Sequence, residues 1–157
     1  MKPQVARAAL MAGRLFLGGI FLYAAYTKLR LPWISFAATV QNYELLPDSA
    51  VIFVARTLPW FELVLGILLV IGAGMRWVGA AASALLLAFF AIMVRAYALG
   101  MDIDCGCFGP GDRLSGMTLL RDGLLLSLSL VLTIAAFSKA RRPPGIPQTA
   151  KPPEATA

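Results

Sequence analysis

The sequence predicts an all-α integral membrane protein, a four-transmembrane-helix bundle with a short interfacial helix after the first span. Of the 157 residues, 59% are hydrophobic and 14% are charged, more apolar surface than a soluble domain of this size can bury. Apolar stretches recur that reach the roughly 20 residues needed to cross the hydrocarbon core as helix, without the alternation of a barrel strand. The predicted spans are Val5–Tyr26, Val51–Ala73, Trp77–Leu99 and Met117–Phe137.

The first span begins beside Lys2 and Arg7, as a cleaved secretory signal would. Its apolar run is long for a signal peptide, and Tyr23-Ala24-Ala25 is a poor cleavage site. We therefore expect the first span to be retained as a signal anchor.

A short amphipathic helix is predicted between the first two spans, over Trp33–Leu46. Trp33, Phe36, Ala37 and Val40 recur at the spacing of one helix face, and Pro32 and Pro47 bracket the segment. We expect this helix to lie flat at the outer membrane interface. An irregular loop is the alternative.

Charged residues inside the predicted spans identify positions that need a partner. An isolated charge there costs at least ~2.5 kcal/mol on insertion scales. Glu62 and Arg95 both fall in the outer half of the bundle, so we expect them to pair and to join the second and third spans. The residues leave open whether this pair is structural or chemical. Lys28 ends the first helix as an interface anchor, and a contribution to thiolate stabilisation is left open.

The distribution of basic residues predicts that both termini are cytoplasmic. One side of the membrane would carry Lys2, Arg7, Arg14, Arg76, Lys139, Arg141, Arg142 and Lys151. The other would carry Lys28, Arg30, Arg56, Arg113 and Arg121 together with nearly every acid. Because lysine and arginine mark the cytoplasmic side, the loop after the third span should face the periplasm of a bacterial inner membrane.

Two regions are predicted: a membrane domain over residues 1–138 and a basic, proline-rich tail over residues 139–157. The tail has five prolines and no aromatic residue, so we expect it to be disordered in the cytoplasm. The net charge of +6 is explained by topology, since the basic residues sit at helix ends. We expect membrane lipid and no nucleic acid as a partner.

The pentad Cys105-Gly106-Cys107-Phe108-Gly109 holds both cysteines of the chain. Two thiols separated by one glycine, in the outer loop, are candidates for a strained and easily reduced disulfide. Arg113, Arg121 and Arg95 are the nearby cations that could favour a thiolate, and the glycines imply a turn that exposes both sulfurs. Cys105 is the expected attacking thiol and Cys107 the resolving one.

Three other interpretations of the pair stay open. A structural disulfide across one residue would close almost no loop and add little stability. A metal site would need ligands from a partner or a second copy, because the chain has no histidine and no third cysteine; we expect no metal. The pair could also be two inert thiols.

Four segments occur in the order found in a known family: Ala25-Tyr26-Thr27-Lys28-Leu29, Tyr43-Glu44-Leu45-Leu46-Pro47, Leu58-Pro59-Trp60-Phe61-Glu62-Leu63 with Gly66, and the cysteine pentad. From Ala8 to Phe137 the chain resembles the MauE branch of the DoxX-like membrane proteins, the methylamine utilisation MauE family. The resemblance implies a four-helix inner-membrane protein that acts with a thioredoxin-like periplasmic protein. It also implies a link to processing, transport or disulfide maturation of the methylamine dehydrogenase small subunit.

The bundle is also similar to the quinone-linked disulfide-generating membrane enzymes of the DsbB and vitamin K epoxide reductase type. It departs from them in having one cysteine pair, spaced Cys-x-Cys. Whether a quinone binds between the helices is therefore left open, and no other cofactor is expected.

The leading hypothesis is a thiol-disulfide oxidoreductase in which Cys105 and Cys107 exchange electrons with a thioredoxin-like partner and support maturation of an exported client. Supporting residues would be Gly106, Phe108, Gly109, Glu62, Arg95, Lys28 and Arg121. A non-catalytic membrane scaffold that anchors a partner enzyme is the alternative. A transporter is disfavoured because there is no broken inverted repeat. Homodimerisation is left open.

Overall fold

The computed structural model describes residues 3–108 and 111–140, which form five helices and no strand. They are α1 (Pro3–Arg30), α2 (Trp33–Gln41), α3 (Asp48–Ile71), α4 (Met75–Ala98) and α5 (Gly116–Ala140). All but α2 are long and apolar enough to cross a membrane, with mean hydropathy between 1.6 and 2.2. The all-α membrane fold with four spans is therefore confirmed. The predicted tail lies outside the described residues apart from its first two positions.

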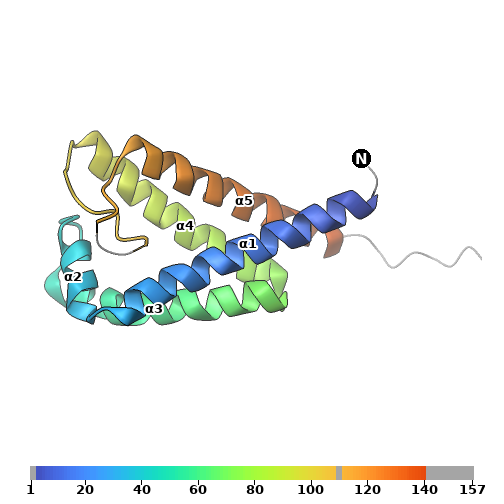
Figure 1. The fold of residues 1–157 in the computed structure, drawn as a ribbon, viewed down its shortest axis with the longest axis horizontal. Coiled ribbons are helices and arrows are strands. Elements are labelled where there is room, and N and C mark those ends of the chain that lie inside the picture. The colour runs from blue at the N-terminus through green and yellow to red at the C-terminus, as the bar shows by residue number, and fades with distance from the viewer. Residues whose placement is uncertain (1–2, 109–110, 141–157) are drawn as a thin grey trace, which may run out of the picture.

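The long helices pack as two pairs, α1 along α3 and α4 along α5 (Figure 1). Glycines allow α1 and α3 to approach closely. A Cβ added at Gly18 would lie 2.8 Å from Val70 Cγ2, and one at Gly66 would lie 2.9 Å from the Leu22 side chain. Small residues at a crossing bring backbones together where lipid offers no hydrophobic drive to associate. The core between the pairs includes Leu17, Leu65, Leu69 and Leu125.

The predicted interfacial helix exists but is shorter than expected. It begins at Trp33 after Pro32 and ends at Gln41, not at Leu46. Glu44 takes a positive φ of 50°, which a helix cannot accommodate. Phe36 faces inward and is buried, so α2 covers the end of the bundle.

Pro59 lies inside α3. The helix begins at Asp48, directly after Pro47, and runs through Pro59 to Ile71. An acidic residue in the first turn is favourable beside the unsatisfied N–H groups of a helix start.

The segment between α1 and α3, which contains α2, and the segment between α4 and α5 lie at one end of the bundle. The α3–α4 turn lies at the opposite end (Figure 1).

The α1–α3 crossing gives a first prediction. Gly18→Ala should lower the free energy of unfolding by about 1–3 kcal/mol, because the added methyl meets Val70 and the backbone of α3. Gly19→Ala is the matched control, since a Cβ at Gly19 meets no atom within 4 Å. Unfolding of both variants in detergent should show a lower midpoint for the first alone. Equal midpoints would contradict close packing at this crossing.

Candidate functional site

Between α4 and α5, residues 99–108 and 111–115 fold back onto the end of the bundle. The Cys105 N–H donates to the Asp112 carbonyl at 2.8 Å, and the Leu114 N–H donates to the Ile103 carbonyl at 2.9 Å. Cys105 is 3% exposed and Cys107 is half-buried. The expectation that the turn exposes both sulfurs is therefore wrong. Gly109, in the same pentad, lies outside the described residues.

Two buried side chains hold the loop by the carbonyl groups of its cysteines. Lys28 Nζ donates to both carboxylate oxygens of Glu62 and to the Cys107 carbonyl, each at 2.9 Å. Tyr43 Oη donates to the Cys105 carbonyl at 3.0 Å. Burial, and then the nearby thiol groups, raise the pKa of Tyr43 above its ordinary value, so the phenol keeps its proton.

The expected Glu62–Arg95 pair is wrong, because Glu62 pairs with Lys28. The side chains of Lys28 and Glu62 are 2% and 6% exposed. Arg95 is exposed on α4, and no hydrogen bond or ion pair of its side chain occurs within residues 3–108 and 111–140. The structural reason is that α3 runs along α1, so the nearest cation comes from α1.

Gly106 is required by the backbone and by its neighbours. It has a φ of 73°, in the left-handed region that favours glycine. A Cβ at this position would lie 2.8 Å from Thr39 Cγ2 on α2. Any other residue between the two cysteines would therefore require α2 or the loop to move.

The sulfur of Cys105 has both a proton acceptor and hydrogen-bond donors around it. It lies 3.1 Å from Asp112 Oδ2, to which the thiol donates. The Cys107 N–H points to it at 3.4 Å and Arg121 Nη2 at 3.7 Å. Hydrogen bonds from the Cys107 side chain and backbone lower the pKa of Cys105, outweighing burial and Asp112, which raise it.

The sulfur of Cys107 has acceptors around it instead. Within 4 Å lie Asp122 Oδ2 at 3.8 Å, Met93 Sδ at 3.7 Å and the Cys105 carbonyl at 3.9 Å. Its hydrogen bond to Cys105, followed by burial and nearby negative charge, raises the pKa of Cys107 well above that of an ordinary thiol. The pair is thus unequal: the pKa of Cys105 is lowered and that of Cys107 is raised.

Arg121 joins the surroundings of the two sulfurs. Its guanidinium contacts Asp112 Oδ2 at 2.8 Å and the two oxygens of Asp122 at 3.1 and 3.3 Å. It also lies over the Phe108 ring, 4.4 Å from the centroid. Phe108 in turn packs against Tyr23 of α1. Of the predicted supporting residues, Lys28, Glu62, Gly106, Phe108 and Arg121 gather at the cysteines, and Arg95 does not.

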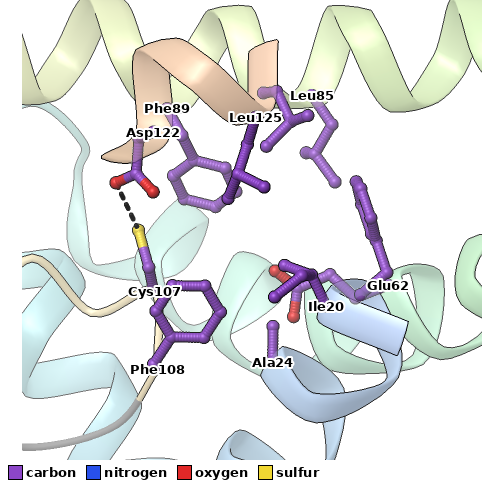
Figure 2. A pocket seen from close by; sticks show the side chains of 11 residues that line it. Ile20, Ala24, Glu62, Leu85, Phe89, Cys107, Phe108, Asp122 and Leu125 are labelled. Atoms are coloured by element: carbon purple, nitrogen blue, oxygen red, sulfur yellow. Dashed lines mark hydrogen bonds between the residues drawn. The ribbon is translucent and has the colours of Figure 1, made fainter. Parts of the chain in front are cut away.

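A small cavity lies inside the bundle beneath the loop (Figure 2). It measures about 40 Å³ and has Cys107 and Asp122 on one side and Glu62 of α3 on the other. The rest of its wall is apolar and comes from α1, α4, α5 and Phe108. Cys107 therefore faces a largely apolar interior.

A larger cavity of about 430 Å³ reaches Cys105 and Gly106 between α2, α3 and α4. Its size suits a small hydrophobic molecule. However, the two hydroxyl groups in its wall, on Thr39 and Tyr43, already donate to the carbonyls of Ser35 and Cys105. The described part of the wall thus offers no spare side-chain hydroxyl for quinone oxygens, and we derive no electron transfer to a quinone. Nor do the described residues bring together three metal-ligating side chains.

Four residues at the site were missed by sequence reasoning: Tyr43, Met93, Asp112 and Asp122. Asp122 carried a usable signal, because it lies inside the predicted span Met117–Phe137 just as Glu62 lies inside Val51–Ala73. Asp112 and Met93 carried none, since their proximity to the sulfurs depends on how the loop folds back.

Comparison with known proteins gives one family. The sequence model of the family described as Methylamine utilisation protein MauE matches residues 6–136. Proteins named Methylamine utilization protein MauE are similar to this chain in Paracoccus denitrificans, 37% identical over 78% of this chain and 67% of that protein, and in Paracoccus versutus, 38% identical over 84% and 71%. The one from Methylophilus methylotrophus is 38% identical over 62% of this chain and about half of its own length. No solved structure matches.

The buried ion pair gives a second prediction. Lys28→Met should destabilise the fold by about 3–5 kcal/mol, because it leaves the Glu62 carboxylate buried without its cation. The double variant Lys28→Met/Glu62→Leu should regain most of that loss in an unfolding titration. Both variants should react faster with a neutral maleimide, since the Cys107 carbonyl loses its donor in each. A double variant no more stable than the single one would contradict the pairing.

The unequal thiols give a third prediction. As pH rises, alkylation by iodoacetamide should begin at Cys105 below the pH at which an ordinary thiol reacts, because its lowered pKa gives thiolate earlier. Cys107 should react only at higher pH, because its pKa is raised. Fragment masses of the alkylated loop assign each label. Labelling that begins at Cys107 would contradict the assignment.

Proposed function

The chain belongs to the methylamine utilisation protein MauE family, and on that basis we propose that it is a membrane thiol-disulfide oxidoreductase acting with a periplasmic thioredoxin-like protein. It would support disulfide maturation of an exported client during methylamine utilisation. The client would be the small subunit of methylamine dehydrogenase. The names of the relatives support the pathway, and the two cysteines support the chemistry.

The proposed exchange uses the two sulfurs in different roles. The Cys105 thiolate attacks a disulfide of the partner, which forms a mixed disulfide and releases one partner sulfur as a thiolate. The Cys107 sulfur, as thiolate, then attacks Cys105, so the Cys105–Cys107 bond forms and the second partner sulfur leaves. Two electrons pass to the partner, and the same steps run in reverse when the partner's dithiol reduces the ring.

The observation that carries this proposal is the difference between the two sulfur environments. Each sulfur lies near a carboxylate, Asp112 for Cys105 and Asp122 for Cys107. Cys105 also has the guanidinium of Arg121 and a backbone N–H directed at it, whereas the other neighbours of Cys107 are acceptors. A purely structural disulfide needs neither arrangement, and inert thiols need no buried lysine at their backbone.

The proposed location is the bacterial inner membrane, with both termini cytoplasmic and the cysteine loop periplasmic. The distribution of basic residues supports cytoplasmic termini and, with them, a loop in an oxidising compartment, where disulfides form and persist. The first loop and the cysteine loop share one end of the bundle, which supports a common face for the partner (Figure 1).

The fourth prediction separates the proposal from the scaffold alternative. Cys107→Ser should accumulate a mixed disulfide between Cys105 and the thioredoxin-like partner, because the resolving sulfur is gone. Cys105→Ser should accumulate none, and the double variant should leave the client short of disulfides. Non-reducing gels of intact cells, after acid quenching and alkylation, measure all three.

A scaffold makes the opposite prediction. If the double serine variant matures the client at the normal rate, the relay is wrong and the protein acts by anchoring. Reagent-labelling of the loop from the cytoplasmic side would likewise contradict the proposed location.

A further inference from the structure

We propose that Asp122 is the catalytic base for the resolving sulfur: its carboxylate takes the proton of Cys107 when the Cys105–Cys107 bond closes. This inference rests on the proposed function and adds a residue to it. Asp112 and Arg121 act at the other sulfur, so each cysteine has its own carboxylate.

The geometry assigns Asp122 to Cys107 alone. Asp122 Oδ2 lies 3.8 Å from Cys107 Sγ, within reach of a thiol hydrogen bond, and Asp122 is 6% exposed (Figure 2). Glu62 lies across the same cavity, but both its oxygens accept from Lys28. The contact of Asp112 is with Cys105. Asp122 is therefore the carboxylate positioned to accept this proton.

The environment of Cys107 makes such a base necessary. The sulfur has no N–H or O–H donor directed at it within the described residues, so no hydrogen bond there stabilises its thiolate. The adjoining cavity of about 40 Å³ is walled mainly by apolar side chains, which offer no proton acceptor. A fixed carboxylate supplies the proton acceptor that the apolar wall lacks.

Arg121 keeps Asp122 ready for this step. Its Nε and Nη2 groups donate to the two oxygens of Asp122 and so hold the carboxylate beside Cys107 Sγ. Protons and electrons balance in this step. The Cys107 S–H bond breaks, its proton goes to Asp122, and the sulfur attacks Cys105, which breaks the bond between Cys105 and the partner sulfur. The leaving sulfur carries the electron pair to the partner. Arg121 still pairs with Asp112 once Asp122 is neutral.

A small neutral disulfide tests the assignment without any protein partner. Dithiodipyridine, added to the reduced full-length protein in detergent, should release one thiopyridone per chain as the Cys105 thiolate attacks its disulfide. A second thiopyridone should follow as Cys107 closes the ring. Asp122→Asn should leave the first phase within about twofold and slow the second by roughly 10²-fold, the lower range for loss of a general base.

Two further variants keep the result specific. Asp122→Glu restores a carboxylate and should recover much of the second phase, which a purely structural role would not give. Asp102→Asn is the matched control. Asp102 is an exposed acid in the loop that carries the two cysteines, 3.9 Å from Arg113 and with no hydrogen bond to either sulfur. It should leave both phases unchanged.

The possible failures are distinguishable. A second phase unaltered in Asp122→Asn, or both phases slowed equally there and in Asp122→Glu, overturns the base while leaving the relay intact. A selective loss of the second phase supports the base even if no thioredoxin-like partner is ever trapped, in which case the proposed function alone is wrong.

Discussion

The ammonium group of Lys28 is the contact on which the arrangement of this protein depends. An ammonium carries three protons, and here each has an acceptor: two are the oxygens of Glu62 and the third is the Cys107 carbonyl. Burying two charges is costly unless every donor and acceptor is satisfied. The cysteine loop thus completes the pair that joins α1 to α3, and the ion pair in turn fixes the loop. The stability of the bundle and the position of the sulfurs consequently depend on the same three hydrogen bonds of Lys28.

Much of the fold could be predicted because few backbone structures can satisfy their polar groups in a membrane. Chains that cross lipid as single apolar runs must be helical, so the four spans followed from composition and length. Their ends did not follow, since the first helix continues past Tyr26 to Arg30 and so brings Lys28 under the loop. Neighbour relations between helices did not follow either. Depth alone suggested Arg95 as the partner of Glu62, whereas packing selected Lys28.

The site was predictable in its chemistry and not in its geometry. Two cysteines around a glycine indicate redox exchange by their spacing, and an acid within an apolar span indicates a group with a function. Which acid serves which sulfur depends on the return of the loop over the bundle, which places Asp112 beside Cys105 and Asp122 beside Cys107. No local sequence pattern encodes that return. It arises from long-range hydrogen bonds, such as that from Tyr43 to the Cys105 carbonyl.

The position of Gly106 constrains how this motif could change over time. A Cβ at this position would meet Thr39 of α2, and the backbone here is left-handed, so neither a side chain nor an ordinary backbone conformation fits between α2 and the thiol pair. Inserting a residue to give the more common two-residue spacing would need extra room there. The one-residue spacing of the thiols is therefore limited by the packing of Gly106 against α2. A chain of this family that adopted the wider motif would have to remodel its interfacial helix at the same time.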